Sequence, residues 1–359
     1  TTTAIITVNP LPSAITGTPS LIICQGSNTT LGSTPGGGTW STTATSLITL
    51  NSTSGAVTGV GAGVATVTYT APTGCQRTGQ VTVNPIPLPI GGPTQVCVGN
   101  CITLTCSTGG GTWSSLTPAI GTINSTTGSF CGVATAGGVA TVKYTLTSSS
   151  CARTTTVNVS PLPNSFTLSS SGGVTSVCAG SAGVTLCLSG SQVGVSYQLK
   201  NSGTPVGSAI NGTGSSICFP PQTTSGVYTV DATNAAGCTR SMSGSVTLTV
   251  FPIPTIVGPS AVCNLATGTL TATPAGGTWS SGTPGCITIG ASTGLMTGVG
   301  GTGCTSVITY TAPSSAGSCP ATRTVSVSPS PTSITIPRGV CAADTVTVFS
   351  SPTGGTWTT

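Results

Sequence analysis

The chain has 359 residues, of which only 3% are charged, and a formal net charge of +5. It has no histidine, and its acidic residues are Asp231 and Asp344 alone. The only bases left to activate a catalytic Ser or Cys are therefore Lys143, Lys200 and these two isolated Asp, and the clustered carboxylates of a calcium site are missing. We therefore expect no enzyme and no cofactor, and the interruption of every apolar run by Thr, Ser, Gly or Pro excludes a membrane-spanning stretch of about 20 residues.

The first elements in the chain predict β-structure. Residues 20–24 form a short apolar run before a Gln-Gly-Ser-Asn turn, and residues 47–50 and 56–60 flank an Asn-Ser-Thr-Ser-Gly turn typical of a hairpin. Residues 65–70 alternate Ala, Val and Tyr with three Thr, which places one apolar face against a core. A last strand at residues 81–84 leads into Pro-Ile-Pro.

Two phrases recur along the chain. Gly-Thr-Trp recurs at four tryptophans, and a strand that ends in Pro-x-Pro recurs between them. Such repetition predicts an array of modules rather than one large domain. The predicted parts are a tail of a preceding module (1–9), module 1 (10–84), module 2 (85–160), a divergent module 3 (161–251), module 4 (252–328) and the start of module 5 (329–359). The ragged ends predict a piece of a longer protein.

The fold class predicted is all-β: a tandem array of small immunoglobulin-like sandwiches. Module 3 lacks Trp and offers Tyr197, Phe219 and Tyr228 instead, so it is expected to be a variant of the same sandwich. The linkers are short and rich in Pro, which fixes the backbone and removes amide donors. We therefore expect an elongated rod.

Sixteen cysteines at recurring positions indicate an oxidising, extracellular compartment. Each module has a leading Cys soon after its start and a trailing Cys just before its last strand. The predicted pairs within modules are Cys24 with Cys75, Cys97 with Cys151, Cys178 with Cys238, and Cys263 with Cys319. By analogy of position, the additional pairs are Cys106 with Cys131, Cys187 with Cys218, and Cys286 with Cys304.

Cys101 and Cys341 remain without a partner in this scheme. Cys101 either pairs locally with Cys97 or Cys106 or forms a bond to another chain, and Cys341 has its partner beyond the sequence. A zinc site at these cysteines is disfavoured because zinc spacing and His ligands are missing.

Aromatic residues recur with the modules and are predicted to fill their cores: Trp40, Trp113, Trp279, Trp357, Tyr69, Tyr144 and Tyr310. The alternative is an exposed Trp platform that stacks on sugars. An Arg also recurs after each trailing Cys, either as an edge charge that opposes aggregation or as part of a basic stripe for anionic polysaccharide. The Gly-x-Gly-x-x-Gly run at residues 298–303 lacks a following helix and predicts a turn, not a nucleotide site.

Several phrases carry a resemblance: Gly-Gly-Thr-Trp-Ser at residues 37–41, Ser-Gly-Ala-Val-Thr-Gly-Val at 54–60, Ala-Thr-Val-Thr-Tyr at 65–69 and Val-Thr-Val-Asn-Pro at 81–85. They resemble the immunoglobulin-like, PKD-like repeats of large Bacteroidota cell-surface adhesins, the SprB-like gliding-motility type. Module 3 resembles a second kind of repeat in the same proteins. The resemblance implies type IX secretion, a location on the outer cell surface and a role in cell adhesion and gliding.

The function predicted is therefore a structural shaft segment of a long extracellular filament or adhesin, stiffened by disulfides within its modules. Its expected partners are further modules or copies of the same protein, and surface polysaccharide or substratum; we expect no nucleic acid. The alternatives are a repeated polysaccharide- or ice-binding module and the non-catalytic stalk of a secreted enzyme.

Overall fold

The computed structural model describes residues 3–4, 6–301, 303–331, 334, 341–342, 345–348 and 351. They form two compact units: unit 1 is Thr1–Leu162 with Ala236–Cys238, and unit 2 is Pro163–Ala235 with Thr239–Thr359. Each unit contains two separate hydrophobic cores. We keep the names modules 1 to 4 for the predicted segments, since each supplies one core. The predicted module 5, including Trp357, falls largely outside the described residues.

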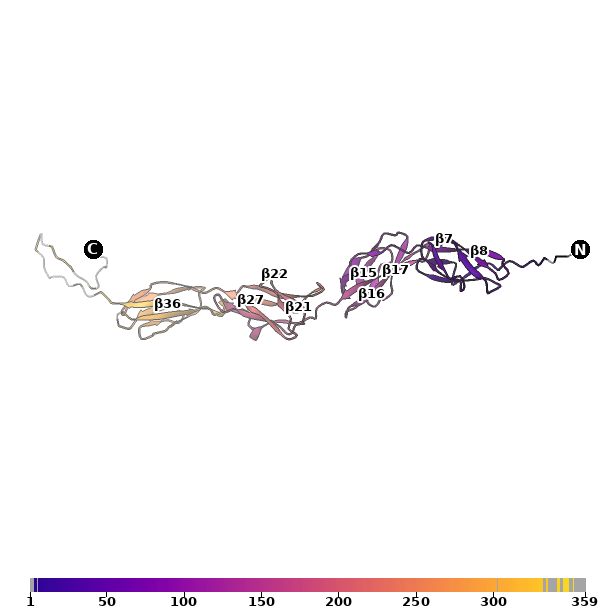
Figure 1. Ribbon diagram of the computed structural model, residues 1–359. Helices are drawn as coiled ribbons and strands as arrows, with labels where there is room; N and C mark the ends of the chain where they lie inside the picture. The colour runs from indigo at the N-terminus through magenta and orange to yellow at the C-terminus, as the bar shows by residue number, and fades with distance from the viewer. Residues whose placement is uncertain are drawn as a thin grey trace. The chain divides into compact units, whose positions relative to one another are not determined.

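Module 1 is a sandwich of two four-stranded sheets, in which β7 and β8 are the long strands (Figure 1). One sheet has the order β1-β3-β6-β5 and the other β2-β8-β7-β4. The bounds are β1 (Thr16–Thr18), β2 (Ile22–Cys24), β3 (Asn28–Gly32), β4 (Thr39–Thr42), β5 (Ile48–Leu50), β6 (Ala56–Gly59), β7 (Gly63–Thr70) and β8 (Gln76–Asn84).

Module 2 repeats the plan with its first sheet divided. The order β10-β17-β16-β13 forms one layer, and β11-β15-β14 and the pair β12-β9 form the other sheets. The bounds are β9 (Ile90–Gly91), β10 (Gln95–Cys97), β11 (Cys101–Thr103), β12 (Thr105–Cys106), β13 (Gly111–Ser115), β14 (Gly121–Ile123), β15 (Ser129–Gly132), β16 (Gly138–Leu146) and β17 (Ala152–Ser160).

Module 3 has a small sheet, β18-β20-β24, and a larger one, β19-β27-β25-β21-β22, with β23 beside β21 and β26 beside β25. The bounds are β18 (Leu168–Ser170), the 3-10 helix η1 (Ser171–Gly173), β19 (Ser176–Cys178), β20 (Val184–Leu188), β21 (Val195–Asn201), β22 (Thr204–Pro205), β23 (Ile210–Asn211), β24 (Ile217–Gln222), β25 (Gly226–Asn234), β26 (Thr239–Ser241) and β27 (Val246–Phe251).

Module 4 returns to the plan of module 2, with sheets β29-β36-β35-β32, β30-β34-β33 and β28-β31. The bounds are β28 (Thr255–Val257), β29 (Ala261–Cys263), β30 (Thr267–Thr269), β31 (Thr271–Thr273), β32 (Thr278–Ser281), β33 (Ile287–Ile289), β34 (Leu295–Gly298), β35 (Thr305–Thr311), the 3-10 helix η2 (Ser314–Ala316) and β36 (Pro320–Ser328). The chain is thus all-β, a tandem array of sandwiches, as the sequence predicts.

The alternation of apolar and polar residues predicted from the sequence places the apolar side chains in the cores. In β7, Ala65, Val67 and Tyr69 are buried while the Thr residues between them face outward or lie half-buried. Burial of such apolar side chains stabilises a fold by about 25 cal/mol per Å² of apolar surface removed from water. A module with short strands therefore depends on each of these alternating positions.

In modules 1, 2 and 4, the hairpin turn that ends in Gly55, Gly128 or Gly294 closes over the Trp of its module. In module 1 the Asn51 side chain accepts hydrogen bonds from the amides of Thr53 and Ser54, at 3.0 and 2.8 Å. Gly55 has a φ of +68°, and a Cβ there would lie 2.9 Å from the Trp40 Nε1. Only glycine fits, because the position needs both a left-handed backbone and close approach of the indole.

Candidate functional site: the joints between modules

The leading strand of each module pairs in parallel with the last strand of the same module. β2 runs beside the end of β8, so that Cys24 lies opposite Asn84. The same register places the other leading cysteines beside the last residues of their modules: Cys97 opposite Ser160, Cys178 opposite Phe251 and Cys263 opposite Ser328. A leading Cys therefore lies at the end where the chain leaves its module.

The trailing Cys lies at the opposite end, because it directly precedes the last strand in modules 1, 2 and 4 and precedes β26 in module 3. Cys75 comes directly before β8, whose nine residues span about 26 Å at roughly 3.3 Å per residue. A disulfide requires two Cα atoms within about 7 Å. The predicted pairing of Cys24 with Cys75 is therefore wrong, and the same geometry makes the pairs Cys97 with Cys151, Cys178 with Cys238, and Cys263 with Cys319 wrong.

Instead, each leading Cys bonds to the trailing Cys of the following module. The three cross-module bridges share a Cα–Cα distance of 5.6 Å: Cys24–Cys151, Cys97–Cys238 and Cys178–Cys319. In each bridge both cysteines belong to one compact unit, since Ala236–Cys238 belong to unit 1. Parallel pairing at the end of one module thus supplies a thiol to the start of the next module's last strand.

The trailing cysteines occupy a repeated environment. Cys151 and Cys238 are buried, with exposed fractions of 1% and 0%. Their Sγ atoms lie 4.0 Å from the Asn84 carbonyl oxygen and 3.8 Å from the Ser160 carbonyl oxygen, respectively. Cys151 and Cys238 therefore pack against the residue that ends the preceding module.

The amide after each leading Cys closes the same end. Gln25 donates its backbone N–H to the Asn84 carbonyl at 2.9 Å, and Val98 donates to Ser160 at 3.0 Å. Modules 3 and 4 repeat this contact, from Ala179 to Phe251 at 2.8 Å and from Asn264 to Ser328 at 3.0 Å. The leading Cys is thus held at the module end by backbone bonds on both of its sides.

Three further bridges lie within modules: Cys101–Cys131, Cys187–Cys218 and Cys286–Cys304. Cys101 lies directly opposite Cys131 on β11 and β15, with a Cα–Cα distance of 4.1 Å. The predicted pair of Cys106 with Cys131 is wrong because β12 carries Cys106 to β9, opposite Ile90. Cys101 is accordingly neither unpaired nor bonded to Cys97 or Cys106.

Free thiols, among the residues that the structure describes, are those of Cys75, Cys106, Cys263 and Cys341. Cys75 has the environment of a trailing Cys, because its Sγ lies 3.7 Å from the Asn9 carbonyl oxygen. Residues 6–9, Ile-Thr-Val-Asn, differ in one residue from the Val-Thr-Val-Asn that ends module 1. Cys263 likewise has the position of a leading Cys.

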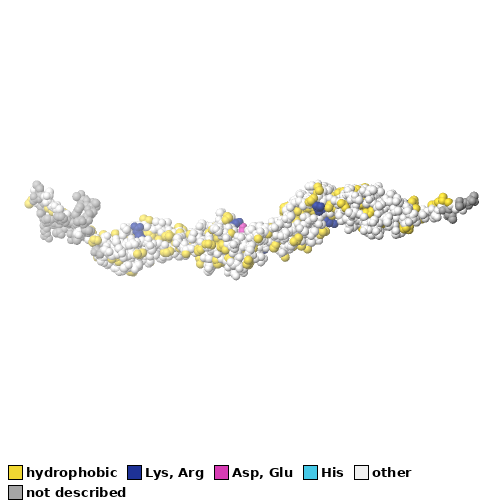
Figure 2. Space-filling view, viewed as in Figure 1, with side chains coloured by type: hydrophobic (Ala, Val, Ile, Leu, Met, Phe, Trp, Pro, Cys, Tyr) yellow, Lys and Arg dark blue, Asp and Glu magenta, His cyan; other side chains and the backbone are white. Residues whose placement is uncertain are grey.

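The recurrent Arg contacts the leading segment in two modules. Arg323 on β36 donates to the carbonyls of Ile256 and Gly258, at 3.2 and 2.6 Å. Arg240 donates to the Pro163 carbonyl at 3.1 Å. Arg323 thus holds the leading segment beside the last strand of module 4, and Arg240 holds it beside β26 of module 3, a role that neither predicted alternative included. On the face shown in Figure 2, basic side chains form separate spots on a mainly neutral surface rather than a continuous band.

The predicted core aromatics of modules 1, 2 and 4 are buried and paired. Trp40, Trp113 and Trp279 have exposed fractions of 6%, 7% and 7%. Each ring centroid lies 4.6 Å from that of the Tyr opposite on the neighbouring strand, namely Tyr69, Tyr144 and Tyr310. At this depth the indoles offer no platform for a sugar.

Each of these Tyr hydroxyls closes the loop before the Trp strand. The Tyr310 hydroxyl donates to the Pro274 carbonyl at 2.6 Å and accepts from the Gly277 amide at 2.8 Å. Tyr69 makes the same two contacts with Pro35 and Gly38. The Tyr thus joins the core to the glycine run that precedes Trp.

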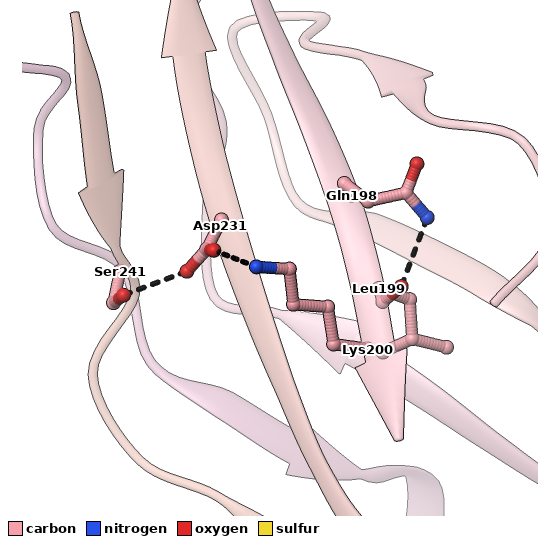
Figure 3. A network of polar contacts seen from close by, with 5 residues as sticks. All are labelled: Gln198, Leu199, Lys200, Asp231 and Ser241. Carbon is pink, nitrogen blue, oxygen red and sulfur yellow. Dashed lines mark hydrogen bonds and ion pairs between the residues drawn. The ribbon is translucent and has the colours of Figure 1, made fainter. Parts of the chain in front are cut away.

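Module 3 holds the one ion pair found among the described residues (Figure 3). Lys200 Nζ on β21 lies 2.5 Å from Asp231 Oδ2 on β25, and the Ser241 hydroxyl donates to Asp231 Oδ1 at 2.6 Å. The hydrogen bond from Lys200, followed by that from Ser241, holds the pKa of Asp231 below its ordinary value against the opposing effect of partial burial. The group joins three neighbouring strands.

The described part of the chain offers few features of a metal, nucleotide or membrane site. There, no group of three or more His, Cys, Asp or Glu side chains could hold a metal ion, and no helix is both long and apolar enough to span a membrane. The glycine run that begins at Gly298 connects strand β34 to strand β35. The remaining acidic residue, Asp344, lies outside the described residues.

No protein-family model matches the sequence, and no curated protein matches it. Among solved structures, the chain is similar to invasin, a bacterial integrin-binding protein, at 16% identity over 89% of this chain and 71% of that chain, with a TM-score of 0.32. It is also similar to the ICAM-5 D1–D4 ectodomain fragment, at 12% identity over 88% and 100%, with a TM-score of 0.35. A third is the fragment with the N-terminal eight Ig domains of Down Syndrome Cell Adhesion Molecule, at 14% identity over 86% and 48%, with a TM-score of 0.34.

Proposed function

We propose that this chain is a shaft segment of a long extracellular filament or adhesin, and that it serves surface attachment. The observation that carries the proposal is the series of cross-module bridges, in which each leading Cys is bonded into the following module. A binding domain that acts alone has no need of covalent bonds to its neighbours, whereas a shaft must transmit force through every joint. Disulfides also persist mainly outside the reducing cytosol, which favours export.

We extend the series to modules of the same kind on both sides. Cys75 has the surroundings of the bonded trailing cysteines, and Cys263 has the register of the bonded leading cysteines. In the assembled filament, Cys75 accepts the leading Cys of a preceding module, and Cys263 bonds to the trailing Cys of a following one. The partners in this proposal are thus further modules of the same protein.

The resemblance of the repeats to large Bacteroidota adhesins gives this proposal its finer form. The protein would be exported by type IX secretion, lie on the outer cell surface and contribute to gliding motility. The alternative of a sugar-stacking Trp surface is disfavoured, since the three described Trp side chains are buried. Nothing in the described residues favours a hydrolase stalk over a filament shaft.

Immunogold electron microscopy on intact cells that make the protein tests this function. An antibody against the 359-residue chain is expected to label extracellular fibres, and protease treatment of whole cells should remove the label. Deletion of the gene should reduce attachment and gliding. Label that appears only after cell lysis, or unchanged attachment in the deletion strain, would contradict the proposal.

A further inference from the structure

Two segments of each module run side by side in the same direction. In module 1, the leading segment ends at Cys24 beside Asn84, the last residue of β8. From this end, β8 continues by peptide bonds into the leading segment of module 2, whereas Cys24 continues by a disulfide into Cys151, just before the last strand of module 2. At each joint, the last strand of one module therefore continues into the leading segment of the next, and the leading segment continues through the disulfide toward the last strand of the next.

Tracing these covalent bonds gives two lines through the described modules. Line A comprises residues 10–24, 151–178 and 319–331, joined by Cys24–Cys151 and Cys178–Cys319. Line B comprises residues 75–97 and 238–263, joined by Cys97–Cys238. The residues between the leading and trailing Cys of each module, which form most of each sandwich, belong to neither line.

We propose that line A bears tension along this chain, that line B shares it where Cys75 and Cys263 are bonded into neighbouring modules, and that the sandwich bodies are excluded from the tensile path. A stretched network becomes taut along its shortest covalent path, because longer paths between the same points stay slack. Line A is that path here. The bodies excluded are residues 25–74, 98–150, 179–237 and 264–318.

Hydrogen bonds hold the two lines together inside each module. In module 1, Thr82 donates to the Leu21 carbonyl at 2.9 Å, in addition to the contact between Gln25 and Asn84. In module 4, Ser326 donates to the Ser260 carbonyl at 3.0 Å. The Arg323 contacts with Ile256 and Gly258 also join the two lines. Because the paired strands of the two lines run parallel, tension that both lines share in an assembled filament does not shear this ladder.

The topology sets a limit on extension. The shortest path runs from the N-terminus to Cys24, through residues 151–178, and from Cys319 to the C-terminus. It contains about 90 residues, or roughly 315 Å at about 3.5 Å per residue. The reduced chain of 359 residues can extend to roughly 1,250 Å. Pairing of leading with trailing Cys inside each module would instead give about 137 residues, or roughly 480 Å.

Single-molecule pulling on the purified chain tests the inference, with enzymatically coupled tags at the two termini. The oxidised protein is expected to reach a contour of roughly 315 Å and stop, and phosphine reductant should lengthen it about fourfold. In the double variant Cys24→Ser, Cys151→Ser, the shortest path passes through the Cys97–Cys238, Cys187–Cys218 and Cys178–Cys319 bridges. Its contour should rise to about 165 residues, or roughly 580 Å.

The matched control is Cys187→Ser with Cys218→Ser, which removes a bridge inside an excluded body. Its contour should equal that of the oxidised wild type. A wild-type contour near 480 Å or longer, or a control that lengthens like the Cys24 variant, would overturn the inference. The measurement concerns the purified chain alone, so its failure is distinct from a failure of the surface-filament function.

Discussion

The ends and the interiors of the modules use disulfides in different ways. At the ends, the bridges join cysteines 127 or 141 residues apart and link one module to the next. In the interiors, they join cysteines 18 to 31 residues apart within one sandwich. Strand direction, rather than position along the repeat, therefore decides which cysteines meet.

Module 1 shows this difference most clearly, because its described residues form no disulfide inside the module. It nevertheless has the same Trp–Tyr pair and the same parallel pairing as modules 2 and 4. Interior bridges thus reinforce a sandwich that its apolar core already specifies. Bridges at the ends supply what no core can, a covalent bond between neighbours.

The largest effect is expected from opening a joint. Cys24→Ser with Cys151→Ser removes a bridge that closes a 127-residue loop, worth about 5 kcal/mol of unfolded-chain entropy in the usual treatment. Calorimetry should show lower melting temperatures for modules 1 and 2, with module 4 unchanged. Cys106→Ser, which removes a free thiol, is the control; equal melting of the two variants would refute a structural role for the joint.

A smaller, local effect is expected from an interior bridge. Cys187→Ser with Cys218→Ser opens a loop of 31 residues, for which the same treatment gives about 4 kcal/mol. Hydrogen–deuterium exchange should accelerate in β20 and β24 while modules 1 and 2 keep their protection. Loss of protection across all four modules would show that interior bridges also act between modules.

Loss of one core hydroxyl should cost less again. Tyr310→Phe leaves the Pro274 carbonyl and the Gly277 amide without their shared partner, which we expect to cost about 1–3 kcal/mol. Exchange in β35 and β32 reports the change. Tyr69 makes the same contacts in module 1, so Tyr69→Phe should produce a matching loss of stability there. Unequal losses would contradict an equivalent role for the two hydroxyls.

The smallest effect is expected at the ion pair of module 3. The pKa of Asp231 is lower in the folded state, so its contribution is present above the unfolded pKa of about 3.9 and is lost as the pH falls through the folded pKa. Asp231→Asn should destabilise module 3 at pH 7 by less than about 1 kcal/mol. Urea unfolding at pH 7 and pH 2 measures it, with Lys200→Met as the partner in a double-mutant cycle; an undiminished difference at pH 2 would contradict the assignment.

The sequence predicts the all-β class and most strand positions because alternation and turn residues are local signals. The hairpin around Asn51 and the strand at residues 65–70 occur where their patterns place them. Two of the three predicted interior pairs, Cys187 with Cys218 and Cys286 with Cys304, are also confirmed, whereas Cys106 with Cys131 is wrong. These features depend only on short stretches of chain.

The joints were not predictable in this way. Whether the leading strand runs parallel or antiparallel to the last strand is decided by the packing of a whole sandwich, and no residue near Cys24 encodes it. Without that direction, the repeat pattern pairs Cys24 with Cys75 in the same module. The one available signal was that the leading Cys and the trailing Cys of each module stand at opposite ends of its repeat.

Tryptic mapping of the oxidised, thiol-blocked chain tests the cross-module bridges most directly, because cleavage after Arg77, Lys143 and Arg153 separates the alternatives. We predict that peptide 1–77 is linked to peptide 144–153 through Cys24 and Cys151. Release of peptide 1–77 alone, with peptide 144–153 linked to peptide 78–143, would contradict the account.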